Sequence, residues 1–220
     1  MTYYEFMEKW KKARPEYQTE HKNFCNDGIV KEGIWAEPSN SKIMFLLKET
    51  YSHFCDDIRG NGHCGSGTSP TFWRRMKMWT YIIDKVLKRN IPSFEEVKEQ
   101  KEQANDSIAY VNLKKCGEKK ELNKEAYSND NNICVYVKRD KDFLLEQINF
   151  IKPQIILCSG TFKFCNILFP DIEANKIADK LYKIRDMYLI DFYHLSRRGA
   201  YKKNYDELLK IIHPLLGKAL

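Results

Sequence analysis

Four continuous apolar segments, separated by stretches of helical periodicity, organise this chain. Each segment has the length of a strand and is apolar at consecutive positions, which is typical of a strand covered on both faces. The segments are residues 43–47 (IMFLL), 108–113 (IAYVNL), 154–159 (QIILCS) and 187–192 (MYLIDF), and residues 181–184 form a candidate edge strand. We predict that the four segments form the centre of a sheet.

Between these segments, apolar residues recur every three or four positions, which is the spacing of one helix face. Tyr3, Phe6, Met7 and Trp10 show this spacing near the start of the chain. The same spacing predicts helices at residues 72–89, 143–151, 161–168 and 202–216, with a short charged helix within 93–104. Residues 14–41 and the lysine-rich residues 114–132 show neither pattern, and we expect them to be irregular.

Strands that alternate with helices imply crossover connections and a parallel sheet with helices on both faces. The predicted fold class is therefore α/β, a three-layer α/β/α domain around a central, mostly parallel four-stranded sheet. The length of 220 residues suits one domain over residues 1–220, with the helix and loop of residues 1–41 packed on it.

Composition narrows the class of protein. The chain is 43% hydrophobic, 13% aromatic and 30% charged, which excludes an intrinsically disordered protein. No apolar run approaches the about 20 residues of a membrane helix, and the first residues are polar and amphipathic, so we expect a cytoplasmic monomer with no membrane partner. The formal charge of +7 permits an anionic partner without identifying one.

The carboxyl ends of the predicted strands are the expected ligand site, because ligands of open α/β sheets bind beyond those ends. The rule selects four short segments: residues 48–51, 112–116, 159–161 and 193–200. Three of them are unusually polar for segments that follow buried strands. We therefore expect the functional residues to lie in these segments.

Three of these segments resemble motifs of the uracil-DNA glycosylase superfamily. Residues 47–51 (LKETY) follow a buried strand, as the family's Gly-Gln-Asp-Pro-Tyr or Gly-Glu-Ala-Pro-Gly turn does. Residues 110–113 (YVNL) contain an asparagine in the place of the family's base-reading asparagine, and residues 194–196 (HLS) resemble its His-Pro-Ser motif. The stretch 144–160 resembles the helix and strand that precede the last motif, so the resemblance spans roughly residues 42–215.

The resemblance implies an activity and a role for each matched residue. Glu49 would activate water, His194 would stabilise the departing base, and Asn112 would read its edge, with Tyr51 at the position of the tyrosine of the first motif. These residue types suit the hydrolysis of an N-glycosidic bond, because a histidine can stabilise negative charge on a leaving base and a carboxylate can orient water. An asparagine amide offers a donor and an acceptor to a pyrimidine.

Each assignment has a structural alternative. Glu49 could be a strand-terminal salt-bridge acid, His194 a hydrogen-bonded histidine after a strand, and Asn112 a turn cap. The chain also departs from the family motifs, with Leu46-Leu47 in the glycine region, Thr50 in place of proline and Leu195 in place of proline.

Other residues would recognise the extruded base and the DNA strand. Phe72, with Trp73, is a candidate platform for stacking the base, although either could instead pack in the core, and Phe54 or Tyr51 could take the role. The expected contacts to phosphate are Ser66, Ser69, Ser196, Arg197, Arg198 and Lys202, with Thr68 and Lys203 nearby, and the alternative for the cations is a solvated helix end.

No metal or cofactor is predicted. The seven cysteines lack a framework spacing and are interpreted as reduced thiols, with Cys158 and Cys165 in the core. Cys116 and Cys134 follow the asparagine motif as two ligands do in the iron–sulfur members of the superfamily, but the N-terminal part offers only Cys25 where a cluster uses four cysteines. The glycine-rich loop contains four side chains of types that bind zinc: His53, Cys55, His63 and Cys64. We interpret them as side chains of a loop that binds no metal, and a zinc site is the alternative.

Three functions remain in view. The first is a DNA base-excision glycosylase that hydrolyses the N-glycosidic bond of uracil or a modified base, with single-stranded or damaged DNA as its partner. The second is a non-catalytic module that keeps the fold and binds nucleic acid or a nucleotide. The third is a hydrolase of free nucleosides or nucleotides.

Overall fold

A computed structural model describes residues 1–17, 24–50, 70–99, 106–117, 128–197 and 199–216. The protein is an α/β protein built on one mixed sheet of seven strands in the order β1-β3-β2-β4-β7-β6-β5. The strands are β1 (Gly28–Ile29), β2 (Ile43–Glu49), β3 (Ile108–Lys114), β4 (Ile155–Ser159), β5 (Lys176–Ala178), β6 (Leu181–Ile184) and β7 (Met187–Phe192).

The four predicted strands form the centre of this sheet. β3, β2, β4 and β7 pair in parallel, with Ile43 opposite both Ile108 and Ile155, and Ile155 opposite Tyr188. β1, β6 and β5 extend the sheet through antiparallel pairs. The prediction of a four-stranded, mostly parallel sheet was therefore wrong in its strand count and its edges, because strands of two or three residues are too short to show a period. The edge strand predicted at residues 181–184 is confirmed as β6.

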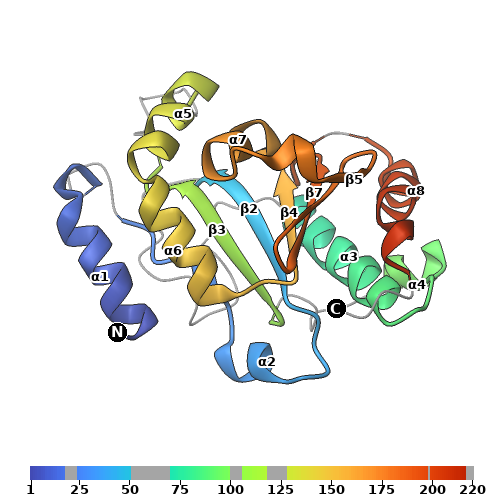
Figure 1. Cartoon of the computed structure of the whole chain (residues 1–220). Helices are drawn as coiled ribbons and strands as arrows, with labels where there is room; N and C mark the ends of the chain where they lie inside the picture. Colours follow the sequence, from blue (N-terminus) through green and yellow to red (C-terminus); the bar gives the residue numbers. More distant parts are fainter. Residues whose placement is uncertain (18–23, 51–69, 100–105, 118–127, 198, 217–220) are drawn as a thin grey trace.

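Helices cover both faces of the sheet, as Figure 1 shows. Helices α1, α5, α6 and α7 bury their apolar residues in one cluster, and α3, α4 and α8 bury theirs in another on the opposite face. Their bounds are α1 (Tyr3–Ala13), α3 (Pro70–Leu87), α4 (Phe94–Glu99), α5 (Asp130–Arg139), α6 (Lys141–Ile151), α7 (Cys165–Leu168) and α8 (Tyr201–Ile212), and a short α2 (Glu32–Ala36) precedes β2. Short 3-10 turns occupy Pro15–Tyr17, Phe162–Phe164, Ile172–Asn175 and His213–Leu215. Within the described residues, no helix is long and apolar enough to cross a membrane.

Two helices and one strand end differ from the expected pattern. The sequence did not predict α2 or α5, and β3 runs on to Lys114, a residue expected in a loop. Helix α5 buries only Ile133 and Val137 of its ten residues, which is too few apolar positions for a clear helical face. Its start is instead specified locally by Asn129, whose side chain accepts a hydrogen bond from the backbone of Asn132 as an N-cap.

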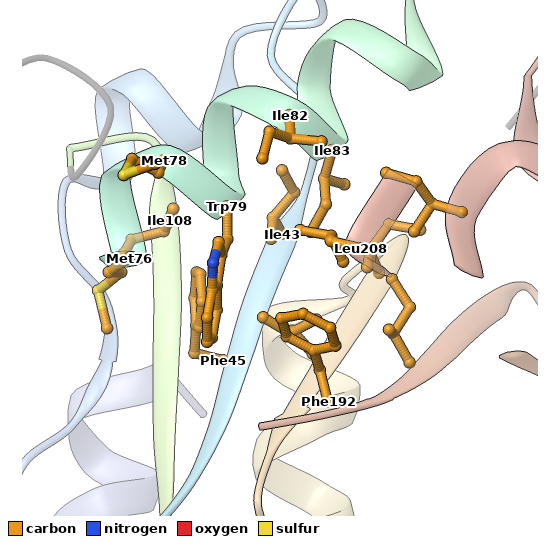
Figure 2. Packing of buried hydrophobic residues seen from close by; sticks show 14 of the residues in the cluster. Ile43, Phe45, Met76, Met78, Trp79, Ile82, Ile83, Ile108, Phe192 and Leu208 are labelled. Carbon is orange, nitrogen blue, oxygen red and sulfur yellow. The ribbon is translucent and has the colours of Figure 1, made fainter. Parts of the chain in front are cut away.

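Part of the hydrophobic packing on the α3 face of the sheet is shown in Figure 2. Trp79 of α3 is buried and meets the ring of Phe192 edge-on, with 4.8 Å between the centroids. Phe45 from β2 and Ile82 and Ile83 from α3 belong to the same cluster. This packing fixes α3 against β2, which ends in Glu49, and against the end of β7, which His194 follows.

The N-terminal segment packs on the other face through a buried carboxylate. Asp140, at the junction of α5 and α6, accepts hydrogen bonds from Arg14 (2.6 Å) and from the Tyr17 hydroxyl (2.5 Å). Burial acts to raise the pKa of Asp140, but the hydrogen bonds from Arg139, Tyr17 and Arg14 outweigh it, so the pKa lies below its ordinary value. A charged Asp140 thus holds the chain after α1 to the α5–α6 junction.

Replacing Trp79 with alanine should lower the free energy of unfolding by about 3–5 kcal/mol, because a large buried side chain leaves a cavity. Urea unfolding followed by circular dichroism measures this change. Val135→Ala is the matched control, since Val135 is 63% exposed, and it should change stability by less than about 0.5 kcal/mol. Equal effects of the two variants would contradict the packing described for α3.

Candidate functional site

The candidate site lies where the four parallel strands end together. Glu49 is the last residue of β2, Asn112 lies two residues before the end of β3, and His194 follows β7 by two residues. Side chains alternate between the faces of a strand, so Asn112 lies on the same face of β3 as Tyr110, which belongs to the α3 cluster. The partners of Glu49 lie beside α5 instead, because Ser128 precedes this helix and Lys114 Nζ lies over the ring of Tyr136. Three strand intervals of about 4.8 Å separate β3 from β7, so the strand that carries Asn112 and the strand that His194 follows lie roughly 14 Å apart, with β2 and β4 between them.

The carboxylate of Glu49 is held by hydrogen bonds. Its Oε1 accepts from the backbone N–H of Ser128 at 2.7 Å, and its Oε2 accepts from the Ser128 hydroxyl at 2.7 Å and from Lys114 Nζ at 3.1 Å. Lys114 is fully buried, and the side chain of Glu49 is only 6% exposed. Glu49 therefore forms the salt bridge that the structural alternative anticipated, at the position that the family resemblance gives to the water-activating acid.

Asn112 belongs to a buried polar network. Its backbone N–H and its Nδ2 both donate to Asp27 Oδ2, at 2.6 and 3.1 Å. Asp27 Oδ1 accepts from Lys115 at 2.7 Å and from Gln147 at 2.7 Å, and Lys115 also donates to Gln147 at 2.8 Å. Asp27 and Lys115 are both completely buried. The network fixes the orientation of the Asn112 amide.

His194 has a defined proton position. The backbone N–H of Ser196 donates to its Nδ1 at 3.2 Å, so this nitrogen carries a lone pair and the neutral ring carries its proton on Nε2. Burial lowers the pKa of His194 below its ordinary value, and the positive charge of Lys48 lowers it further. The ring is therefore neutral at pH 7 and presents an N–H donor.

Gly160 and Phe72 shape the surroundings of His194. Gly160 follows β4 with φ of +70°, and a Cβ there would lie 3.2 Å from the Cβ of His194, so a larger residue would be strained and crowded. Phe72, from the first turn of α3, is half-buried with its ring centroid 6.4 Å from that of His194. Phe72 also packs on Trp73 and the core, so both of its predicted roles remain compatible with its position.

The predicted phosphate contacts that the structure describes are exposed. Ser196, Arg197 and Lys202 all lie on the surface. The guanidinium of Arg197 stacks 3.5 Å above the ring of Tyr193, and Lys202 pairs with Asp206 at 2.7 Å. Tyr51, Ser66, Ser69 and Arg198 lie outside the described residues, as do Phe54 and Thr68.

The cysteines that the structure describes are free thiols, namely Cys25, Cys116, Cys134, Cys158 and Cys165. Cys158 and Cys165 are both buried in one core cluster, which confirms their predicted packing. Within the described part of the chain, no three His, Cys, Asp or Glu side chains gather in a metal-binding group. His53, Cys55, His63 and Cys64, the candidate zinc ligands, lie outside it.

The structure places Glu49, Asn112 and His194 along one edge, but no hydrogen bond joins these three among the described residues. Sequence reasoning missed their partners Lys114, Ser128 and Asp27. Two consecutive lysines directly after a buried strand were the available signal for a buried charge at that strand end. Neither a protein-family model nor a curated protein matches this chain.

Replacing Lys115 with methionine should lower the free energy of unfolding by about 3–5 kcal/mol, because the charge of Asp27 would stay buried without its cation. Adding Asp27→Asn should restore part of this loss, since the buried charge is then absent. Lys98→Met is the control: its pair with Glu95 is exposed, so the change should stay below about 1 kcal/mol. Denaturant unfolding measures all three, and no recovery in the double variant would contradict the ion pair.

Proposed function

We propose that this chain is a DNA base-excision glycosylase with the three-layer α/β/α arrangement of the uracil-DNA glycosylase superfamily, and that it hydrolyses the N-glycosidic bond of uracil or a modified base. The observation that carries the proposal is the state of His194. A neutral imidazole with its proton on Nε2, fixed at the carboxyl end of a parallel strand, suits the stabilisation of a departing base.

The chemistry of the leaving group explains why this state matters. Breaking the N-glycosidic bond leaves negative charge on the base, and a fixed N–H donor directed at a base carbonyl stabilises that charge as it develops. The Nε2–H of His194 can supply such a donor without a prior change of protonation state. The base must first leave the helical stack, and a single-stranded or damaged target lowers that cost.

Glu49 would act on the sugar side of the bond. An ionised carboxylate has about four acceptor positions, and the three donors from Ser128 and Lys114 occupy three of them, leaving one on Oε1 for water. Lys114 and Ser128 hold the carboxylate in place, so Glu49 can orient water and stabilise positive charge on the sugar.

The remaining predicted residues would bind the substrate. Asn112, with its amide orientation fixed by Asp27, would read the base edge, and Phe72, with Tyr51, would contact the base face. Ser196, Arg197 and Lys202, with Ser66, Ser69 and Arg198, would contact the DNA backbone. The reaction as proposed needs no cofactor.

A second candidate is a module that binds nucleic acid or a nucleotide without cleaving it. The binding of Glu49 by Lys114 and Ser128, which leaves it a single acceptor position, and the engagement of the Asn112 Nδ2 with Asp27 favour this interpretation. The two functions differ in product, because only the glycosylase forms an abasic site.

Glu49→Gln and His194→Ala should each reduce abasic-site formation by about 100-fold or more, because each removes a group that acts in the transition state. A panel of oligonucleotides containing uracil or other modified bases supplies the assay. Glu95→Gln and His213→Ala are matched controls, since both side chains are exposed away from the strand ends, and they should leave the rate unchanged.

The protein could instead bind the same oligonucleotides, with an affinity that falls as the salt concentration rises, and release no base from any of them. That result would contradict the glycosylase and support the binding module. Turnover of free nucleosides without oligonucleotide binding would identify the third function instead. Circular dichroism of each variant separates a loss of chemistry from a loss of fold.

The pH dependence of base release should follow the neutral form of His194. Because burial and Lys48 lower the pKa of His194 below its ordinary 6.5, the rate constant of base release should decrease as the pH falls and should reach half of its maximum at a pH below 6.5. Single-turnover rates across this range, with protein stability followed in parallel, measure the effect. A rate that rises as the pH falls through 6.5 would mean that the protonated ring is the active form.

A further inference from the structure

Arg75 is a buried cation that binds the chain directly after His194. It lies in α3, is 2% exposed, and donates from Nη1 to the carbonyl oxygen of Leu195 at 2.9 Å and to that of Arg197. Its Nη2 donates to the carbonyl oxygen of Gly199 at 3.2 Å. A buried guanidinium with three backbone acceptors is a rigid anchor, because the planar fork fixes the direction of each bond.

One of these bonds connects Arg75 to His194 through a single peptide group. The carbonyl of Leu195 and the N–H of Ser196 belong to the same peptide, which is trans and planar, so the two groups point in opposite directions. Arg75 holds the oxygen on one side, and the N–H on the other side donates to His194 Nδ1. Hydrogen bonds arranged in such a chain also polarise one another.

The same helix reaches the ring of His194 directly. Phe72 and Arg75 are three residues apart in α3 and so lie on one face of the helix. Phe72 lies next to the imidazole, while Arg75 holds the backbone that follows it. The packing of Trp79 on Phe192 fixes α3 against the strand that leads into His194.

We propose that Arg75 is a positioning residue for His194, which acts through the Leu195–Ser196 peptide to keep the imidazole oriented with its Nε2–H available to the substrate. The catalytic consequence rests on the proposed glycosylase function, but the effect on the His194 ring does not. Arg75 itself does not touch the substrate.

The carbonyl groups bound by Arg75 also determine what the surface presents. The oxygens of Leu195, Arg197 and Gly199 point inward, so their partial negative charges are directed away from an approaching phosphate. The side chains of Ser196 and Arg197 remain exposed. A loosened segment would therefore be expected to bind DNA less well in addition to holding His194 less firmly.

The test compares Arg75→Met with Arg74→Met. Both remove one positive charge from adjacent positions in α3 and one guanidinium that lies over the ring of Tyr201, but only Arg75 donates to the three carbonyls. A third variant, Arg75→Lys, keeps the buried positive charge but loses the planar fork of the guanidinium. It can be measured in place of Arg75→Met if that variant does not fold.

The first measurement is nitrogen-15 NMR of His194 across pH, which requires only folded protein. In Arg75→Met the Ser196 N–H should leave Nδ1, so the ring should populate both tautomers, and the pKa of His194 should rise toward its ordinary value because a donor that favoured the neutral ring is lost. Arg75→Lys should show a smaller change in the same direction, and Arg74→Met should resemble the unmodified protein, with Lys48 still acting on the ring in all of them.

The second measurement is base release under single-turnover conditions. Arg75→Met should lower the rate constant by about tenfold or more, with a smaller change in oligonucleotide affinity, because a misplaced donor acts chiefly on the transition state. If no variant releases base but the NMR result holds, the proposed function fails and the positioning role stands. An unchanged tautomer and titration of His194 in folded Arg75→Met would overturn the positioning role, whatever the activity.

Discussion

The parallel pairing of β3, β2, β4 and β7 is the constraint on which the rest of the structure depends. Its hydrogen bonds fix one register, in which Ile43, Ile108, Ile155 and Tyr188 lie in line and all four strands end at the same edge. Because helices cover both faces, the strands bury apolar residues on both sides, and the sheet cannot slip by one residue without exchanging its two clusters. The polar side chains that follow the strands are thereby collected at one place.

That edge is crowded with buried charge. The pairs of Glu49 with Lys114 and of Asp27 with Lys115 each place a cation beside a carboxylate, and Ser128, Gln147 and Asn112 donate further hydrogen bonds to the same carboxylates. Buried charges are tolerated only when they are paired and hydrogen-bonded in this way. The hydrogen bonds fix the orientation of the Glu49 and Asn112 side chains, as either role requires. They also occupy polar atoms of both residues, which favours a binding role.

Helix α3 connects this edge to the core. Trp79 is buried against Phe192, Arg75 holds the backbone after His194, and Phe72 lies next to the imidazole itself. A single helix, packed in the core, therefore holds both the ring of His194 and the backbone that follows it. Preorganisation of this kind is what a donor needs if it is to stabilise charge that develops only in a transition state.

The sequence by itself determined the α/β class, the four central strands and the main core-facing helices, because continuous apolar runs and helical spacing are local properties of the chain. It also directed attention to Glu49, Asn112 and His194, since polar residues directly after buried strands are visible without a structure. It did not reveal β1, α5, or the binding of Glu49 to Lys114 and of Arg75 to Leu195. Those contacts join residues 65 and 120 positions apart, and only the tertiary fold, which sets which strand ends and helix faces meet, decides them.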